Sequence, residues 1–166
     1  MRIANYVQDS IVDGPGFRFT LFVQGCPHNC PGCHNPQTHD FSGGKEADTS
    51  EIIKALLSNP LTDGLTLSGG EPFAQAADCA AVAAAAREKG LNVWAYSGWT
   101  FEQLLAKNDE DIMKLLGLCD VLVDGPFILS QRSLELRWKG SRNQRVLDVP
   151  KSLERGEAVE YVKPEF

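Results

Sequence analysis

Hydrophobic residues recur along this chain at two spacings, one typical of strands and one typical of helices. Every second position is apolar in residues 17–25, FRFTLFVQG, which predicts a strand with Phe17, Phe19, Leu21 and Val23 on one face. Residues 48–58, DTSEIIKALLS, place isoleucines and leucines at helical spacing behind polar cap residues. Further on, strands are predicted at 64–70, 91–97 and 119–125, and helices at 72–90, 100–107 and 109–117.

The alternation of strand and helix predicts parallel strands joined by crossover helices. Residues 143–149 are expected to add a strand, and no element is assigned from Lys151 onward. A closed eight-stranded barrel typically needs about 250 residues, whereas this chain has 166. An open doubly wound sheet and an incomplete barrel both fit, in a single domain spanning residues 1–166.

Four unusual segments each follow a predicted strand. They are the cysteine-rich loop after residue 25, SGGEP at 68–72, SGW at 97–99 and DGPF at 124–127. In a parallel sheet the carboxyl ends of the strands lie along one edge, where α/β proteins bind their ligands. We therefore expect all four segments to form one site.

Composition and charge exclude some classes of function. The chain is 43% hydrophobic and 23% charged, as in an ordinary globular protein, and its formal net charge is −6. This charge argues against general nucleic-acid binding. No run is long enough to span a membrane, and the N-terminus MRIANYVQDS lacks the apolar core of a signal peptide, so we expect a cytoplasmic protein without a membrane partner.

The five cysteines are unevenly distributed. Cys26, Cys30 and Cys33 crowd into GCPHNCPGCHN, while Cys79 and Cys119 stand alone in apolar runs. This is a poor disulfide framework and a reasonable set of metal ligands in a reducing compartment. We expect the two isolated thiols to be buried as small hydrophobic groups.

Three clustered thiolates favour zinc or an iron–sulfur cluster. A structural zinc site needs a fourth ligand, which a nearby histidine could supply, although the spacing fits no familiar zinc module; the candidates are His28, His34 and His39. A 4Fe–4S cluster normally takes four cysteines. With three, one iron stays open to a small molecule.

These residues carry a family resemblance. The spacing C-x3-C-x2-C together with SGGEP resembles the radical S-adenosylmethionine (SAM) superfamily, and DGPGFRFTLFVQGCPHNCPGCHNPQTHD is similar to its glycyl-radical activating enzymes. VLVDGPF and WKGSRNQRV, in the second half, most resemble the branch that activates the anaerobic ribonucleoside-triphosphate reductase. The resemblance runs from Asp13 to about Val146.

The resemblance implies an α/β fold, an incomplete TIM-type β/α barrel with mostly parallel strands. It implies a 4Fe–4S cluster on Cys26, Cys30 and Cys33, with SAM chelating the open iron. One electron from the cluster would cleave SAM to methionine and a 5'-deoxyadenosyl radical, which takes a hydrogen atom from a glycine of the reductase. The cofactors supply this chemistry, and the protein supplies placement and exclusion of water.

The resemblance also suggests how SAM is held. Gly69 and Gly70 would meet its methionine amino group, and Glu71 completes their motif, fixing the loop or contacting SAM. Gly32 and His34 would lie against the adenine, although His34 could equally be an ordinary loop histidine. Two further candidates, Ser97 and Asp124, end the next strands; Ser97 stands where longer activases have an acid, and Pro126 where some relatives have lysine.

Partner contacts are also implied. Asp13 lies in DGPG, which reads as a turn and in similar enzymes approaches the partner's glycine loop. Arg137 and Arg142 belong to a basic segment, QRSLELRWKGSRNQR, that could dock the reductase catalytic subunit or a flavodoxin-like electron donor, or could simply be solvated. Two alternatives stay open: an activase of another glycyl-radical enzyme, and a zinc-stabilised interaction module.

Overall fold

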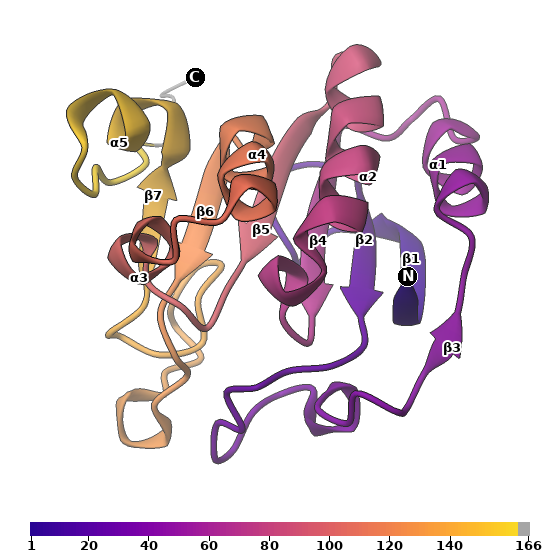
Figure 1. Ribbon diagram of the computed structural model, residues 1–166. Coiled ribbons are helices and arrows are strands. Elements are labelled where there is room, and N and C mark those ends of the chain that lie inside the picture. Colours follow the sequence, from indigo (N-terminus) through magenta and orange to yellow (C-terminus); the bar gives the residue numbers. More distant parts are fainter. Residues whose placement is uncertain (163–166) are drawn as a thin grey trace.

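The computed structural model describes residues 1–162 and contains an open seven-stranded sheet in the order β3-β1-β2-β4-β5-β6-β7 (Figure 1). Its centre is formed by four parallel strands, as the sequence predicts: β2 (Arg18–Val23), β4 (Gly64–Gly69), β5 (Asn92–Tyr96) and β6 (Val121–Asp124). These strands are neighbours in the same order as in the sequence. All four of their carboxyl ends therefore lie along one edge.

The flanking strands are antiparallel to this centre. β1 (Arg2–Ser10) pairs with β2 and carries the two-residue β3 (Lys45–Glu46), while β7 (Arg145–Asp148) pairs with β6. The sequence predicts β7 but not β1 or β3. The strand predicted from residue 17 begins instead at Arg18, and Phe17 lies before it with half of its surface exposed.

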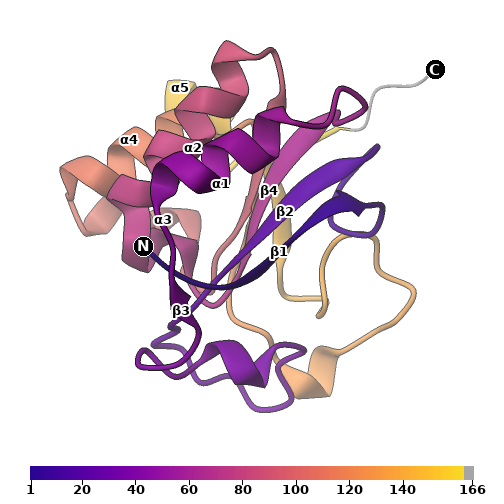
Figure 2. The ribbon, with the colours of Figure 1, turned by 90° about the vertical axis from the view of Figure 1, so that its right-hand side faces the viewer.

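The helices cover one face of the sheet (Figure 2). The helix predicted at 72–90 is divided into a 3-10 turn, Pro72–Gln75 (η2), and the α-helix α2 (Ala76–Glu88). The other α-helices are α1 (Thr49–Leu57), α3 (Phe101–Ala106), α4 (Glu110–Leu118) and α5 (Val149–Arg155). The sequence does not predict α5: residue 149 was expected to end a strand, and no element was expected from Lys151 onward.

The core lies between the helices and the sheet. Alternate strand residues such as Leu21, Leu67 and Val93 are fully buried there, against the small side chains of α2. Cys79 and Cys119 belong to this core, and burial raises the pKa of both thiols, that of Cys119 to about 12. Both are the small hydrophobic groups that the sequence predicts.

The opposite face of the sheet has a different character. Thr20, Thr66 and Trp94 lie side by side on β2, β4 and β5, and Arg18 is fully buried beside them. The Arg18 guanidinium donates to Thr66 Oγ1 and to the carbonyl oxygens of Pro15 and Leu65, at 2.7–2.9 Å. Desolvation lowers its pKa to about 10. Across β2, β4 and β5 the helix-free face is thus polar and aromatic, unlike the core.

Within residues 1–162, none of the helices combines the length and the apolar character that crossing a membrane requires.

Candidate functional site

The cysteine loop and the glycine motif meet at the carboxyl edge of the sheet. The amide of Gly70 donates to the carbonyl of Val23 at 2.9 Å, and the amide of Glu71 donates to the carbonyl of Gly25 at 2.8 Å. The end of β4 is therefore hydrogen-bonded directly to the segment that leads into Cys26. The prediction that these two motifs lie together at one edge of the sheet is confirmed.

A tight turn shapes the second half of the cysteine loop. Pro31 and Gly32 are its central residues, and the Cys33 amide donates to the Cys30 carbonyl at 3.2 Å. Gly32 has φ +75°, which a turn of this kind assigns to glycine at its third position. The amide of Asn35 donates to the sulfur of Cys33 at 3.4 Å. The turn thus brings two cysteines to its ends, and one of their sulfurs accepts a backbone hydrogen bond.

The three thiols of this loop are free and partly exposed. Burial is the main cause of a raised pKa at Cys26, and the carboxylate of Glu71 adds to it. Across the part of the chain that the structure describes, no three His, Cys, Asp or Glu side chains are grouped to hold a single metal ion. Three unpaired thiols on one loop, with an amide directed at a sulfur, are a suitable donor set for an iron–sulfur cluster.

The glycine pair allows two backbones to approach closely. Gly69 has φ +97°, and a Cβ on it would lie 2.6 Å from the amide nitrogen of Val23. A Cβ on Gly70 would lie 2.3 Å from the carbonyl oxygen of Gly25. Because both obstacles are backbone atoms, no side-chain movement could relieve them. The motif needs glycine in order to join the ends of β2 and β4.

Glu71 and Ser97 turn their side chains into the protein. The Ser97 hydroxyl donates to Oε1 of Glu71 at 2.8 Å and accepts from the Trp99 amide at 3.1 Å. Glu71 is fully buried. Gly32 and His34, in contrast, are exposed at the rim, where the His34 ring meets that of Phe127 edge-on at 5.3 Å.

Asp124 ends β6 and is also buried. One of its oxygens accepts from the amide of Phe101 at 2.7 Å, and both accept from the guanidinium of Arg145 on β7. Arg145 also pairs with Glu102, so Asp124 in the first place and Glu102 in the second raise the pKa of Arg145, while Arg145 lowers that of Glu102. Asp124 therefore joins β6, β7 and α3.

Replacing Arg145 by methionine should destabilise the fold by about 3 kcal/mol, since it leaves the buried Asp124 carboxylate without its charged partner. Glu102→Gln, which removes only the 58% exposed partner, should cost no more than about 1 kcal/mol. Urea unfolding followed by circular dichroism measures both. Equal losses in the two variants would mean that Asp124 does not depend on Arg145.

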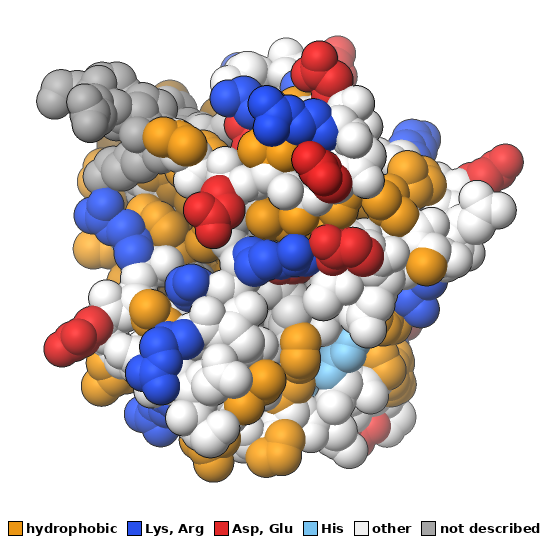
Figure 3. Space-filling model, turned by 90° about the vertical axis from the view of Figure 1, so that its left-hand side faces the viewer, with side chains coloured by type: hydrophobic (Ala, Val, Ile, Leu, Met, Phe, Trp, Pro, Cys, Tyr) orange, Lys and Arg blue, Asp and Glu red, His pale blue; other side chains and the backbone are white. Residues whose placement is uncertain are grey.

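The predicted partner residues lie on two different surfaces. Asp13 lies against the helix-free face of the sheet, where its carboxylate accepts from the hydroxyls of Ser10 and Thr20. Arg137 and Arg142 are exposed on the segment between β6 and β7. Arg145, from the same basic run, is held by its two acids. On the face in Figure 3, basic side chains follow one another down the left of the view.

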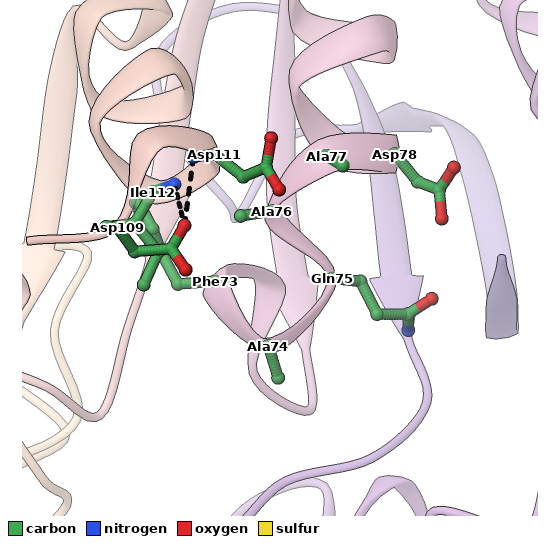
Figure 4. Close-up of a pocket in the computed structure, with 9 residues that line it drawn as sticks. All are labelled: Phe73, Ala74, Gln75, Ala76, Ala77, Asp78, Asp109, Asp111 and Ile112. Atoms are coloured by element: carbon green, nitrogen blue, oxygen red, sulfur yellow. Dashed lines mark hydrogen bonds between the residues drawn. The ribbon is translucent and has the colours of Figure 1, made fainter. Parts of the chain in front are cut away.

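A separate hollow of about 330 Å³ lies beside the first turns of α2 and α4 (Figure 4). Asp109 projects there, but its carboxylate accepts from the amides of Asp111 and Ile112 and so caps α4. This hollow is distinct from the cysteine loop. We assign it no function.

Two residues of the site were not singled out as such from the sequence. From the sequence, His28 is only a possible zinc ligand, yet in the structure its ring is directed at Glu71. Arg145 appears only as one charge in a basic run. The position of His28 inside the cysteine motif was an available signal, whereas nothing local to Arg145 indicates its pairing with Asp124.

An open α/β sheet with three free thiols at its carboxyl edge is compatible with an iron–sulfur protein. Residues 12–147 match the family model described as 4Fe-4S single cluster domain, and the chain belongs to that family.

Curated relatives narrow the assignment. The chain is similar to proteins named anaerobic ribonucleoside-triphosphate reductase-activating protein. The relative from Vibrio cholerae is 38% identical over 87% of this chain and 96% of its own length. Those from Escherichia coli and Haemophilus influenzae are 35% and 34% identical, covering 88% and 87% of this chain and 97% and 96% of their own lengths. The chain belongs to this family of activating proteins. The match favours an iron–sulfur protein over the zinc module that the thiols alone left open.

Proposed function

We propose that this chain activates the catalytic subunit of an anaerobic ribonucleoside-triphosphate reductase. It does so by reductive cleavage of SAM at a 4Fe–4S cluster, which generates a glycyl radical on the reductase. The observation that carries the proposal is the pair of backbone hydrogen bonds that joins the cysteine loop to the glycine motif, in a chain of this family. An activase of another glycyl-radical enzyme is less well supported, because the relatives compared are named for the reductase.

In this proposal Cys26, Cys30 and Cys33 would hold the 4Fe–4S cluster, and SAM would bind at the iron that lacks a cysteine. When bound, the cluster supplies the electron that cleaves SAM. Backbone groups of Gly69 and Gly70 hold the methionine end, and Gly32 and His34 lie at the exposed rim for the adenine. Ser97 and Asp124, at the ends of β5 and β6, are proposed as further contacts for SAM.

The sheet would serve as the wall of an incomplete β/α barrel. Helices on one face and successive parallel strands support this assignment, because a barrel keeps its helices outside. The helix-free face would then be the interior, next to which the glycine of the reductase must come. Asp13, held by Ser10 and Thr20 on that side, is proposed as a contact for the reductase.

The electron donor is proposed to be an acidic, flavodoxin-like protein that meets the basic segment between β6 and β7. We assign the protein to the cytoplasm, with no membrane or nucleic acid as partner. Its net charge of −6 supports the latter.

Reversing both charges, Arg137→Glu with Arg142→Glu, should slow reduction of the cluster by flavodoxin about tenfold at low salt, because favourable steering is lost. The difference should shrink at high salt, where screening is strong. Lys45→Glu with Lys54→Glu makes the same change of charge elsewhere on the surface and is the control. Equal rates for both pairs in stopped-flow absorbance would reject this docking surface.

The central test is anaerobic. The protein is loaded with iron and sulfide, reduced, and given SAM, and 5'-deoxyadenosine is quantified; the reductase is then added and the glycyl radical sought by EPR. A brown protein that releases 5'-deoxyadenosine and produces the radical is expected. A colourless protein that binds stoichiometric zinc would overturn the proposal.

A further inference from the structure

His28, between the first two cysteines, occupies a closely fitted seat. Its Nε2 lies 2.6 Å from Oε1 of Glu71, and its ring meets that of Trp99 edge-on at 4.7 Å. A Cβ on Gly98 would lie 2.4 Å from the imidazole, so only glycine leaves room for this ring. The side chain is 14% exposed. Groups from the ends of β4 and β5 thus enclose a side chain of the cysteine loop.

The Glu71 carboxylate, which contacts His28, is held in place by other donors. Oε1 of Glu71 also accepts from the Ser97 hydroxyl and from the Gly98 amide, both at 2.8 Å, and Oε2 accepts from the Phe73 amide at 3.0 Å. A buried carboxylate is tolerated when it is hydrogen-bonded in this way. Glu71 therefore has its donors inside the protein, and its carboxylate stays in place when the imidazole is removed.

The loop, in contrast, depends on this contact. In the described chain, the His28–Glu71 pair is the only hydrogen bond from residues 27–32 to anything beyond the cysteine loop. The loop is otherwise attached at Cys26, whose amide donates to the His39 carbonyl, and after Cys33. Without the imidazole, the stretch that carries Cys30 would lose this one hydrogen bond to the ends of the strands.

We propose that His28 and Glu71 are positioning residues, which fix the cysteine loop against the ends of β4 and β5 before any cluster is present. This inference rests on the proposed function and deepens it. Since Glu71 directly follows the glycine pair, one carboxylate sets the spacing between the loop for the cluster and the motif for SAM. Neither side chain is a ligand of iron or of SAM. The contact is an outer-shell one that orders the ligands.

The first test uses the protein without iron. The rates at which Cys26, Cys30 and Cys33 react with iodoacetamide are measured by mass spectrometry in the wild type and in His28→Ala, His28→Gln and His39→Ala. His28→Ala should speed alkylation of Cys30 at least threefold with an unchanged thermal midpoint. His28→Gln, which can still donate to Glu71, should restore most of the protection, and His39→Ala should resemble the wild type. Equal rates in all four proteins would overturn the inference.

The second test uses the loaded protein. Iron release to a chelator should be about 10–100 times faster in His28→Ala, as for other outer-shell partners, and His28→Ala with Glu71→Gln should be no worse than Glu71→Gln alone. If Glu71→Gln weakened SAM binding while iron retention stayed normal, Glu71 would be a SAM ligand and the inference would be wrong. A wild type that takes up no iron would defeat the proposed function, while the alkylation rates still decide the positioning role.

Discussion

Replacing any one of Cys26, Cys30 and Cys33 by alanine will reduce iron and sulfide loading severely and bring 5'-deoxyadenosine formation to background. Each variant leaves two thiolates on the loop, and two cannot hold a cluster that already lacks a fourth cysteine. Iron and sulfide content, the absorbance of the cluster and product formation measure the effect. The loss should be the same at all three positions, since each would hold one iron.

The control for this prediction is Cys79→Ala. Cys79 is fully buried in α2 among alanines, so the substitution removes a thiol of the same protein without touching the loop. It should load iron and cleave SAM like the wild type. If instead one of the loop variants kept a full cluster and normal turnover, the assignment of that cysteine as a ligand would be wrong.

The sequence predicts the central strands and the grouping of the site motifs better than it predicts the outer elements of the sheet. Periodicity gives the four central strands because their residues alternate between the aliphatic core and the other face. On β4, Leu65 and Leu67 lie in the core and Thr66, between them, lies on the other face. The order of these strands along the chain then places the cysteine loop beside SGGEP without any knowledge of side-chain contacts. The grouping of the motifs at one edge therefore follows from the order of the parallel strands alone.

The sequence does not predict β1, because its residues lack that alternation. Of its nine residues only Ile3 and Ser10 are buried, and Tyr6 and Val7 are exposed, so backbone pairing with β2 holds it rather than burial. α5 is different, since its signals were present: Asp148 caps it, Pro150 lies in its first turn, and Gly156 ends it with φ +70°. With seven residues, α5 is too short for a helical periodicity to be recognised in its sequence.

The sequence does not indicate which polar residues far apart in the chain pair with each other. Asp124 was predicted as a SAM contact because it ends a strand, yet its carboxylate is engaged by Arg145, 21 residues further on and on an antiparallel strand. Register between β6 and β7 sets that pair, with Asp124 opposite Arg145. Its contact with SAM stays a prediction.

Substituting Gly70 by alanine is expected to lower the rate of SAM cleavage about 100-fold while the fold persists. The added Cβ would lie 2.3 Å from the carbonyl oxygen of Gly25, whereas carbon and oxygen atoms normally stay at least about 3.3 Å apart. The end of β4 must therefore move by about 1 Å relative to the cysteine loop, and a displacement of that size in a reacting site can cost about 100-fold in rate.

The matched control is Gly117→Ala, where a Cβ meets nothing within 4 Å on α4. Removing a glycine from a helix should raise the free energy of unfolding by about 0.5 kcal/mol and leave the rate unchanged. Circular dichroism and iron content establish that both variants are folded and loaded before the rates of 5'-deoxyadenosine formation are compared. A folded Gly70→Ala protein with the wild-type rate would mean that the close approach of the backbones at the ends of β2 and β4 matters for packing alone. A slow variant with an intact cluster would show that the spacing between the cluster loop and the glycine motif governs the reaction.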